Sequence, residues 1–261
     1  MKIAITGKGG VGKTTFSSIL ARLYADEGKN VLAVDADPDA NLGLALGFDQ
    51  ETLSEIVPIA QIKKLVAERT GSNEDNFGKF FKINPKVDDI PDKYAKKCNG
   101  VKLLTLGTVE VGGGGCVCPE HVLIKRIISH LVLRSDDVVI MDMEAGIEHL
   151  GRGTASGVDQ FIVVIEPGRR SIQTYKKVKQ LALDLGVSRV RVVANKVRSE
   201  EDETFIRNEI NEDFLGCIYY NSEVIDADRQ GKSPFDLSDE AIKQVRLIKQ
   251  KIDEELENKL K

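Results

Sequence analysis

The chain has 261 residues, of which 30% are charged, and a formal net charge of −4. This balance excludes a protein that binds nucleic acid through bulk positive charge, and no run approaches the roughly 18 apolar residues of a membrane span. Four cysteines favour thiol or metal chemistry in a reducing compartment over a disulfide framework. The first residues enter a predicted strand directly, so we expect a cytoplasmic protein without a signal peptide that binds neither nucleic acid nor membranes.

Short apolar runs alternate with amphipathic stretches along almost the whole chain. The runs predict strands at 2–6, 30–35, 101–106, 137–142, 160–165, 189–195 and 214–220, and the stretches predict helices at 13–27, 119–134, 168–185, 200–211 and from about 238. The pattern predicts an α/β fold with a mostly parallel sheet covered by helices on both faces, formed by residues 1–261 as a single domain. In residues 51–100, where periodicity is weakest, we expect helices with a mobile or partner-facing surface.

Residues 7–14 read GKGGVGKT, between the first predicted strand and the first predicted helix. This is the GxxxxGK[ST] P-loop in its strand–loop–helix setting. Its backbone N–H groups and the helix N-terminus are expected to surround a polyphosphate. Lys13 should reach the β- and γ-phosphates, and the Thr14 hydroxyl should ligate Mg²⁺. The nucleotide-binding set of this segment is Gly9, Gly10, Val11, Gly12, Lys13, Thr14 and Thr15.

The second predicted strand ends in the acidic sequence VDADPDANLG. Asp35 and Asp37 lie two residues apart, so a strand would place both on one face at its carboxyl end. Ligands of open α/β sheets bind at that end, which makes these carboxylates candidates for chemistry. Asp-Pro-Asp also forms turns readily, and the residues alone leave that structural role open.

The second distinctive region is GGGGCVCPE, residues 112–120. Pro119 suits the first turn of a helix, and the free N–H groups there are expected to lower the pKa of the Cys118 thiol. Cys116 and Cys118 could bind a soft or borderline metal ion, but two thiolates leave a tetrahedral site incomplete. A two-fold axis would supply four, which predicts a homodimer sharing one bridging metal ion. The alternative is a pair of ordinary loop or redox-sensitive cysteines.

Two later strand ends carry further candidates. In VVIMDMEAG, Asp142 follows a buried-strand pattern and comes after a P-loop, which is the Walker B arrangement for holding Mg²⁺. Gly146 would begin a switch segment, and Glu144 is equally compatible with a supporting role and a solvated loop. In VVANK, Asn195 is the expected contact of the adenine edge.

With GKGGVGKTT complete, the chain resembles the deviant Walker A family, which includes the MinD/ParA ATPases and the nitrogenase iron protein. The resemblance implies an ATP hydrolase that binds ATP and ADP. Lys8 would then reach across a nucleotide-bridged dimer to the partner's phosphates, and Asp37 would position the attacking water. Arg198 stands where NKxD GTPases carry Asp, which agrees with ATP as the nucleotide.

Within that class the chain is similar to the CooC family, ATPases that help mature carbon monoxide dehydrogenase by supporting nickel insertion. The similarity extends over GKGGVGKTT, VDADPDANLG, the C-x-C pair, DMEAGIEHLGRG and VVANK. The similarity implies that Cys116 and Cys118 bind Ni²⁺, or Zn²⁺ in its place. It also implies a nickel enzyme as client, for which carbon monoxide dehydrogenase is the expected enzyme and acetyl-CoA synthase is the alternative. Two alternatives stay open: a nucleotide-gated iron–sulfur electron donor, although His149 stands roughly where the iron protein has a cluster Cys, and a MinD/ParA-type positioning ATPase.

Overall fold

The computed structural model describes residues 1–72, 81–107, 118–134, 137–144, 152–187 and 189–258. In this part of the chain, the strands form one sheet with the order β3-β4-β2-β5-β1-β6-β7-β8. Their bounds are β1 Lys2–Thr6, β2 Val31–Ala36, β3 Lys96–Cys98, β4 Val101–Thr105, β5 Val138–Met143, β6 Gln160–Ile165, β7 Val190–Val197 and β8 Phe214–Tyr219. Every neighbouring pair is parallel except β3 with β4, so the predicted fold class is confirmed.

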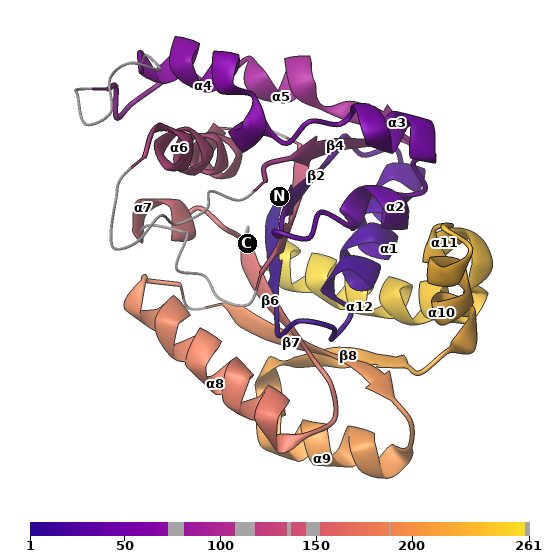
Figure 1. The fold of residues 1–261 in the computed structure, drawn as a ribbon. Coiled ribbons are helices and arrows are strands. Elements are labelled where there is room, and N and C mark those ends of the chain that lie inside the picture. Colours follow the sequence, from indigo (N-terminus) through magenta and orange to yellow (C-terminus); the bar gives the residue numbers. More distant parts are fainter. Residues whose placement is uncertain (73–80, 108–117, 135–136, 145–151, 188, 259–261) are drawn as a thin grey trace.

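Helices cover both faces of this sheet (Figure 1). The longer ones are α1 Lys13–Asp26, α4 Lys63–Thr70, α6 Pro119–Arg134, α8 Arg169–Asp184, α9 Glu200–Ile210, α10 Ser222–Arg229 and α12 Asp239–Glu257, and the shorter ones are α2 Leu42–Leu46, α3 Gln50–Glu55, α5 Ile90–Tyr94, α7 Arg152–Ala155 and α11 Pro234–Leu237. Two 3₁₀ turns lie at Ile59–Gln61 and Asn211–Asp213. Helices α4, α6, α8 and α9 contribute to the core on one face, and α1, α2 and α12 to the core on the other.

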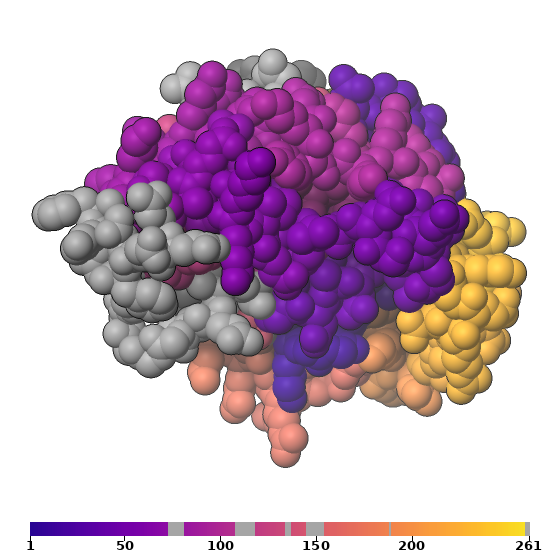
Figure 2. All heavy atoms as spheres, turned by 45° about the horizontal axis from the view of Figure 1, so that its top comes forward, coloured from indigo at the N-terminus to yellow at the C-terminus, as the bar shows by residue number. Residues whose placement is uncertain are grey.

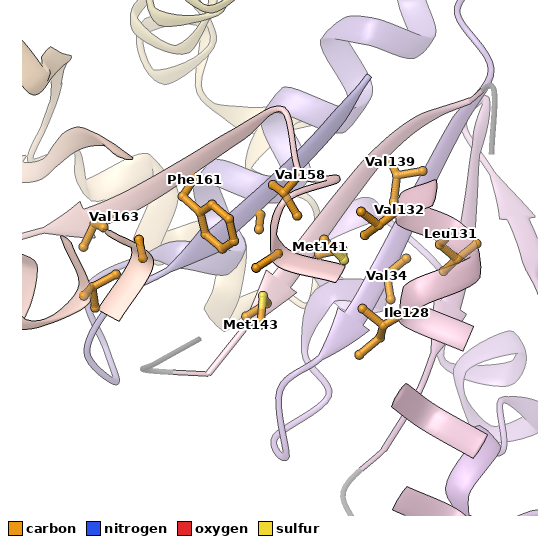
Figure 3. Packing of buried hydrophobic residues seen from close by; sticks show 14 of the residues in the cluster. Val34, Ile128, Leu131, Val132, Val139, Met141, Met143, Val158, Phe161 and Val163 are labelled. Atoms are coloured by element: carbon orange, nitrogen blue, oxygen red, sulfur yellow. The ribbon is translucent and has the colours of Figure 1, made fainter. Parts of the chain in front are cut away.

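The continuous apolar strands follow from this double coverage. Along β5, Val139 and Met141 belong to the core shared with α6, whereas Val138 and Ile140 belong to the core shared with α1. Figure 3 shows Met141 and Val139 beside side chains of α6 such as Val132. Because both faces are buried, alternation of polar and apolar residues disappears from these strands, as the sequence analysis predicted.

The segment with weak periodicity contains α3, α4 and α5, together with the edge strand β3, which was not predicted. Lys96 and Lys97 of β3 are exposed, which is common in an edge strand because charge discourages further pairing. When the top of Figure 1 is turned toward the viewer, the violet and magenta residues of α3, α4 and α5 form one continuous surface (Figure 2). Within the described residues, no helix has the length and apolar character needed to cross a bilayer.

Candidate nucleotide-binding site

The P-loop lies between β1 and α1 and has the backbone shape that its glycines permit. Gly10 and Gly12 have φ angles of 80° and 94°, in the left-handed region that favours glycine. A Cβ on Gly12 would lie only 2.0 Å from Nδ2 of Asn195, so no larger residue fits there without displacement. Helix α1 then begins at Lys13, so its N-terminus opens toward the loop, as predicted.

The structure brings Thr14 and Asp142 together, as the proposed Mg²⁺ site requires. The Thr14 hydroxyl donates to Oδ2 of Asp142 at 2.7 Å, and the Ser17 hydroxyl donates to Oδ1 at 3.3 Å. Asp142 is 1% exposed, and burial raises the pKa of its carboxyl to about 6, although Thr14 and Lys13 oppose the rise. These hard oxygen atoms are of the type that Mg²⁺ prefers. Ser17 was not predicted; its position one helical turn after Thr14 is the signal that could have found it.

Asp35 lies beside Asp142 in the register of β2 and β5, and it is equally buried. Its carboxylate accepts hydrogen bonds from the backbone N–H groups of Asp37 at 3.3 Å and Leu42 at 3.0 Å. It therefore holds both ends of the loop between β2 and α2. Burial, together with the charges of Asp142 and Asp37, raises the pKa of this carboxyl to about 7. The sequence placed Asp35 at the site but gave no indication of this role.

Asp37 and Lys13 face each other across the site. The Lys13 Nζ lies 3.5 Å from Oδ2 of Asp37, and both side chains are largely shielded from solvent. Oδ1 of Asp37 accepts the backbone N–H of Asp39 at 3.1 Å, which fixes the orientation of the carboxylate. A phosphate bound to Lys13 would therefore lie beside the Asp37 carboxylate, where the sequence analysis expects the attacking water.

These residues open into a cleft of about 690 Å³. Its lining consists of Gly9, Gly10, Gly12, Lys13, Thr14, Thr15, Asp37, Pro38, Asp39, Asn41, Leu44, Ala45, Glu144, Val224, Asp228, Lys232 and Pro234. The volume falls within the range of small-molecule sites. The wall formed by Val224, Asp228, Lys232 and Pro234 was not predicted, because it comes from α10, α11 and their connection, which pack beside α2 and carry no local motif.

Two predicted residues have contrasting positions. Asn195 is 7% exposed, and its Nδ2 donates to the carbonyl oxygen of Val11 at 2.8 Å, so its amide is engaged with the P-loop backbone. Its contact with adenine stays a prediction. Lys8 is exposed, as a residue must be if it is to reach a second chain.

The predicted metal site falls partly outside the described residues, since Cys116 lies there, as do Gly146 and His149. Cys118 directly precedes α6, and its carbonyl oxygen accepts the N–H of Val122 at 3.2 Å, so the predicted helix start is confirmed. The expected lowering of its thiol pKa is wrong: burial raises the pKa and outweighs the backbone hydrogen bond from His121. Among the described side chains, no group of three or more His, Cys, Asp or Glu could hold a metal ion.

Residues 2–235 match the sequence model of the CobQ/CobB/MinD/ParA nucleotide binding domain. The chain therefore belongs to this family, and it is an ATPase, as the P-loop and the Asp142 strand predicted.

Two relatives place it more narrowly. The chain is 48% identical over 239 residues to the carbon monoxide dehydrogenase accessory protein CooC of Rhodospirillum rubrum, which covers 91% of this chain and 90% of that protein. It is 47% identical to an uncharacterized ATP-binding protein of Methanocaldococcus jannaschii, over 95% and 96% of the two chains. The resemblance to the CooC family is thus confirmed.

Solved structures share the fold at lower identity. The septum site-determining protein MinD of Pyrococcus horikoshii OT3, complexed with Mg-ADP, has a TM-score of 0.66 over 97% of this chain and 96% of that chain, at 20% identity. A ParA family ATPase from Chlorobium tepidum TLS has a TM-score of 0.68 over 94% and 95%, at 17% identity.

Proposed function

We propose that this chain is a cytoplasmic, homodimeric ATPase that binds Ni²⁺ and assists its insertion into carbon monoxide dehydrogenase. The observation that carries the proposal is the 48% identity to CooC, which extends over about nine-tenths of both chains. Identity at this level, spread along the whole length, favours a shared client chemistry and not only a shared nucleotide cycle. The chain is proposed to act as one domain, with no nucleic acid or membrane partner.

The cleft supports a specific division of labour in ATP hydrolysis. Thr14 and Asp142 would hold the Mg²⁺ that accompanies ATP, and Lys13 would neutralise the β- and γ-phosphates. Asp37, which faces Lys13 across the site, would orient the attacking water. Lys8 of the partner subunit would stabilise the charge that develops on the transferred phosphoryl group, as an arginine finger does. The Asn195 amide, next to the loop, remains the proposed adenine contact.

The transported ion would be bound by Cys116 and Cys118 of both subunits. Four thiolates around a two-fold axis complete a four-coordinate site. A tetrahedral arrangement of them would suit Zn²⁺, and the same soft sulfur donors would bind Ni²⁺ as cargo. Binding of ATP and its hydrolysis would change the affinity for the ion, which requires the ion to bind the two nucleotide states unequally.

Equilibrium dialysis with Ni²⁺ tests the proposal directly. We expect one Ni²⁺ per two chains in the wild type and none in the Cys116→Ala/Cys118→Ala variant. Cys98→Ala is the matched control, because that thiol lies on β3 and contacts the carbonyl of Gly47. Size measurements with ADP, ATP and Ni²⁺ show whether ion binding accompanies dimer formation. Nickel binding that survives loss of both cysteines rejects the proposal, and an anaerobic preparation that contains iron and sulfide in place of nickel favours the electron-donor alternative.

A further inference from the structure

Two consecutive residues at the end of β7 bind two consecutive carbonyl groups of the P-loop. Nδ2 of Asn195 donates to the Val11 oxygen at 2.8 Å, and Nζ of Lys196 donates to the Gly10 oxygen at 2.6 Å. Of these two residues, only Asn195 was a predicted site residue. Lys196 has no part in the ATPase chemistry described so far.

The two contacts fix the direction of the peptide groups between Gly10 and Gly12. In a planar trans peptide, the carbonyl and the N–H point to opposite sides. With the carbonyls of Gly10 and Val11 held toward β7, the N–H groups of Val11 and Gly12 point away from it. A phosphate-binding loop needs its carbonyls turned away in this manner, because an inward carbonyl would repel a polyphosphate whereas N–H groups attract it. Of the two N–H groups, that of Val11 also makes a long contact of 3.4 Å with the Lys8 carbonyl oxygen, so the Gly12 N–H is the one assigned to the polyphosphate.

Lys196 is itself held in place, although it is not buried. Its ammonium group lies 2.6 Å from Oε1 of Glu166, which directly follows β6, and its own backbone N–H donates to Oδ1 of Asn195 at 2.9 Å. Its φ of 57° lies in the left-handed region, which is uncommon for a lysine. Such a conformation persists where surrounding contacts determine it, and these positions cluster at functional sites.

The peptide group that joins Gly10 and Val11 also links Lys196 to the backbone of Lys8. The N–H of Val11 donates to the carbonyl oxygen of Lys8 at 3.4 Å, while the carbonyl of this peptide, on Gly10, accepts from Lys196. A single peptide group therefore separates the Lys196 ammonium from the backbone of the residue proposed to act across the dimer.

We infer that Lys196, braced by Glu166, is a positioning residue of the nucleotide site. It keeps the Gly10 carbonyl turned away from the polyphosphate and holds the loop segment that carries Lys8. This role rests on nucleotide binding by the P-loop and is independent of nickel and of any client enzyme.

The test compares Lys196→Met, Lys196→Arg and Glu166→Gln with the wild type. Lys176→Met is the matched control, because it removes another exposed Lys–Glu pair, with Glu209 at 3.3 Å, from helices α8 and α9. Calorimetric affinity for ADP and ATP is measured first, followed by kcat and KM for ATP hydrolysis and the nucleotide-free melting temperature. Direct affinities keep the test independent of turnover.

For Lys196→Met we expect about a tenfold loss of ADP and ATP affinity, of the size that a lost charge-assisted hydrogen bond produces. Lys196→Arg should recover most of this affinity, because its guanidinium can contact both Gly10 and Glu166. The affinity of Glu166→Gln should lie between those of Lys196→Met and Lys196→Arg. Lys176→Met should match the wild type. Affinities within twofold of wild type in both Lys196→Met and Glu166→Gln overturn the inference. The inference is also overturned if Lys196→Met and Lys196→Arg lose the same nucleotide affinity and show the same fall in nucleotide-free melting temperature.

Discussion

Replacing Asp142 with Asn should make the nucleotide-free protein more stable while abolishing Mg²⁺-dependent ATP hydrolysis. The Asp142 carboxyl is 1% exposed, and burial raises its pKa from the ordinary 3.8 to about 6. A shift of roughly 2 pKa units corresponds to about 3 kcal/mol of folding free energy, at about 1.36 kcal/mol per unit. An Asn amide can keep the contacts with Thr14 and Ser17, because each hydroxyl can either donate or accept.

The sign of the pH dependence follows from which state binds more protons. Between about pH 4 and pH 6 the folded state, in which the pKa of Asp142 is higher, is protonated while the unfolded state is not. The free energy of unfolding therefore falls as pH rises through this window, and the cost of the buried charge is complete above it. The free energy of unfolding that Asp142→Asn gains over the wild type should be largest at pH 8 and close to zero near pH 4.

Thermal unfolding in EDTA at the two pH values measures this effect. For a chain of this size, about 3 kcal/mol corresponds to a rise in melting temperature of about 6–12 °C at pH 8. Asp92→Asn is the control, because the Asp92 side chain is 79% exposed and its ion pair with Lys102 should contribute little. Adding Mg²⁺ and ATP should stabilise the wild type more than the variant. A variant that is less stable than the wild type at pH 8, or equally stabilised at pH 4, would refute the reasoning.

Two further predictions concern the dimer and the P-loop. If Lys8 acts on the partner's nucleotide, Lys8→Met and Asp37→Asn should each be inactive alone, whereas a mixed dimer of the two variants contains one complete site. Random pairing makes about half of the dimers in an equal mixture mixed, so the mixture should regain about a quarter of wild-type turnover. No recovery after subunit exchange would place Lys8 outside the partner's site. Gly12→Ala should lower the free energy of unfolding by about 1–3 kcal/mol and weaken ADP binding at least about tenfold, because the φ of Gly12 is 94° and the new Cβ would lie 2.0 Å from Asn195. Denaturant titration and calorimetry measure these effects, and Gly168→Ala is the control, because a Cβ there has nothing within 4 Å. Equal stability of the two variants would contradict the steric argument.

The sequence was most informative where a local physical requirement leaves few choices. The P-loop needs glycines at fixed spacing, so its position and the start of α1 at Lys13 could be predicted closely. The bounds of α6 and of β6 agree with the prediction, because α6 has a regular amphipathic pattern that begins at Pro119 and β6 contains a continuous apolar run from Phe161 to Ile165. Likewise, Asp142 could be proposed as a Mg²⁺ ligand because it lies near the end of a buried strand that follows a P-loop in sequence.

Contacts between segments far apart in the chain could not be predicted in this way. The pairing of Asp35 with Asp142 depends on strand register, and the engagement of Asn195 and Lys196 with the P-loop depends on β7 ending beside it. The raised pKa of Cys118 shows the same limit, since the sequence revealed its helix start but not its burial.

By itself, then, the sequence determined the α/β class, the P-loop and the strand that carries the Asp142 carboxylate, because these depend on periodicity and on short spacings along the chain. Only the tertiary structure decided which side chains hold the loop, how the Lys13 ammonium is paired with Asp37, and which helices close the cleft. The physical reason is that hydrogen bonding and desolvation depend on the three-dimensional neighbours of a group, and packing of the whole sheet selects those neighbours.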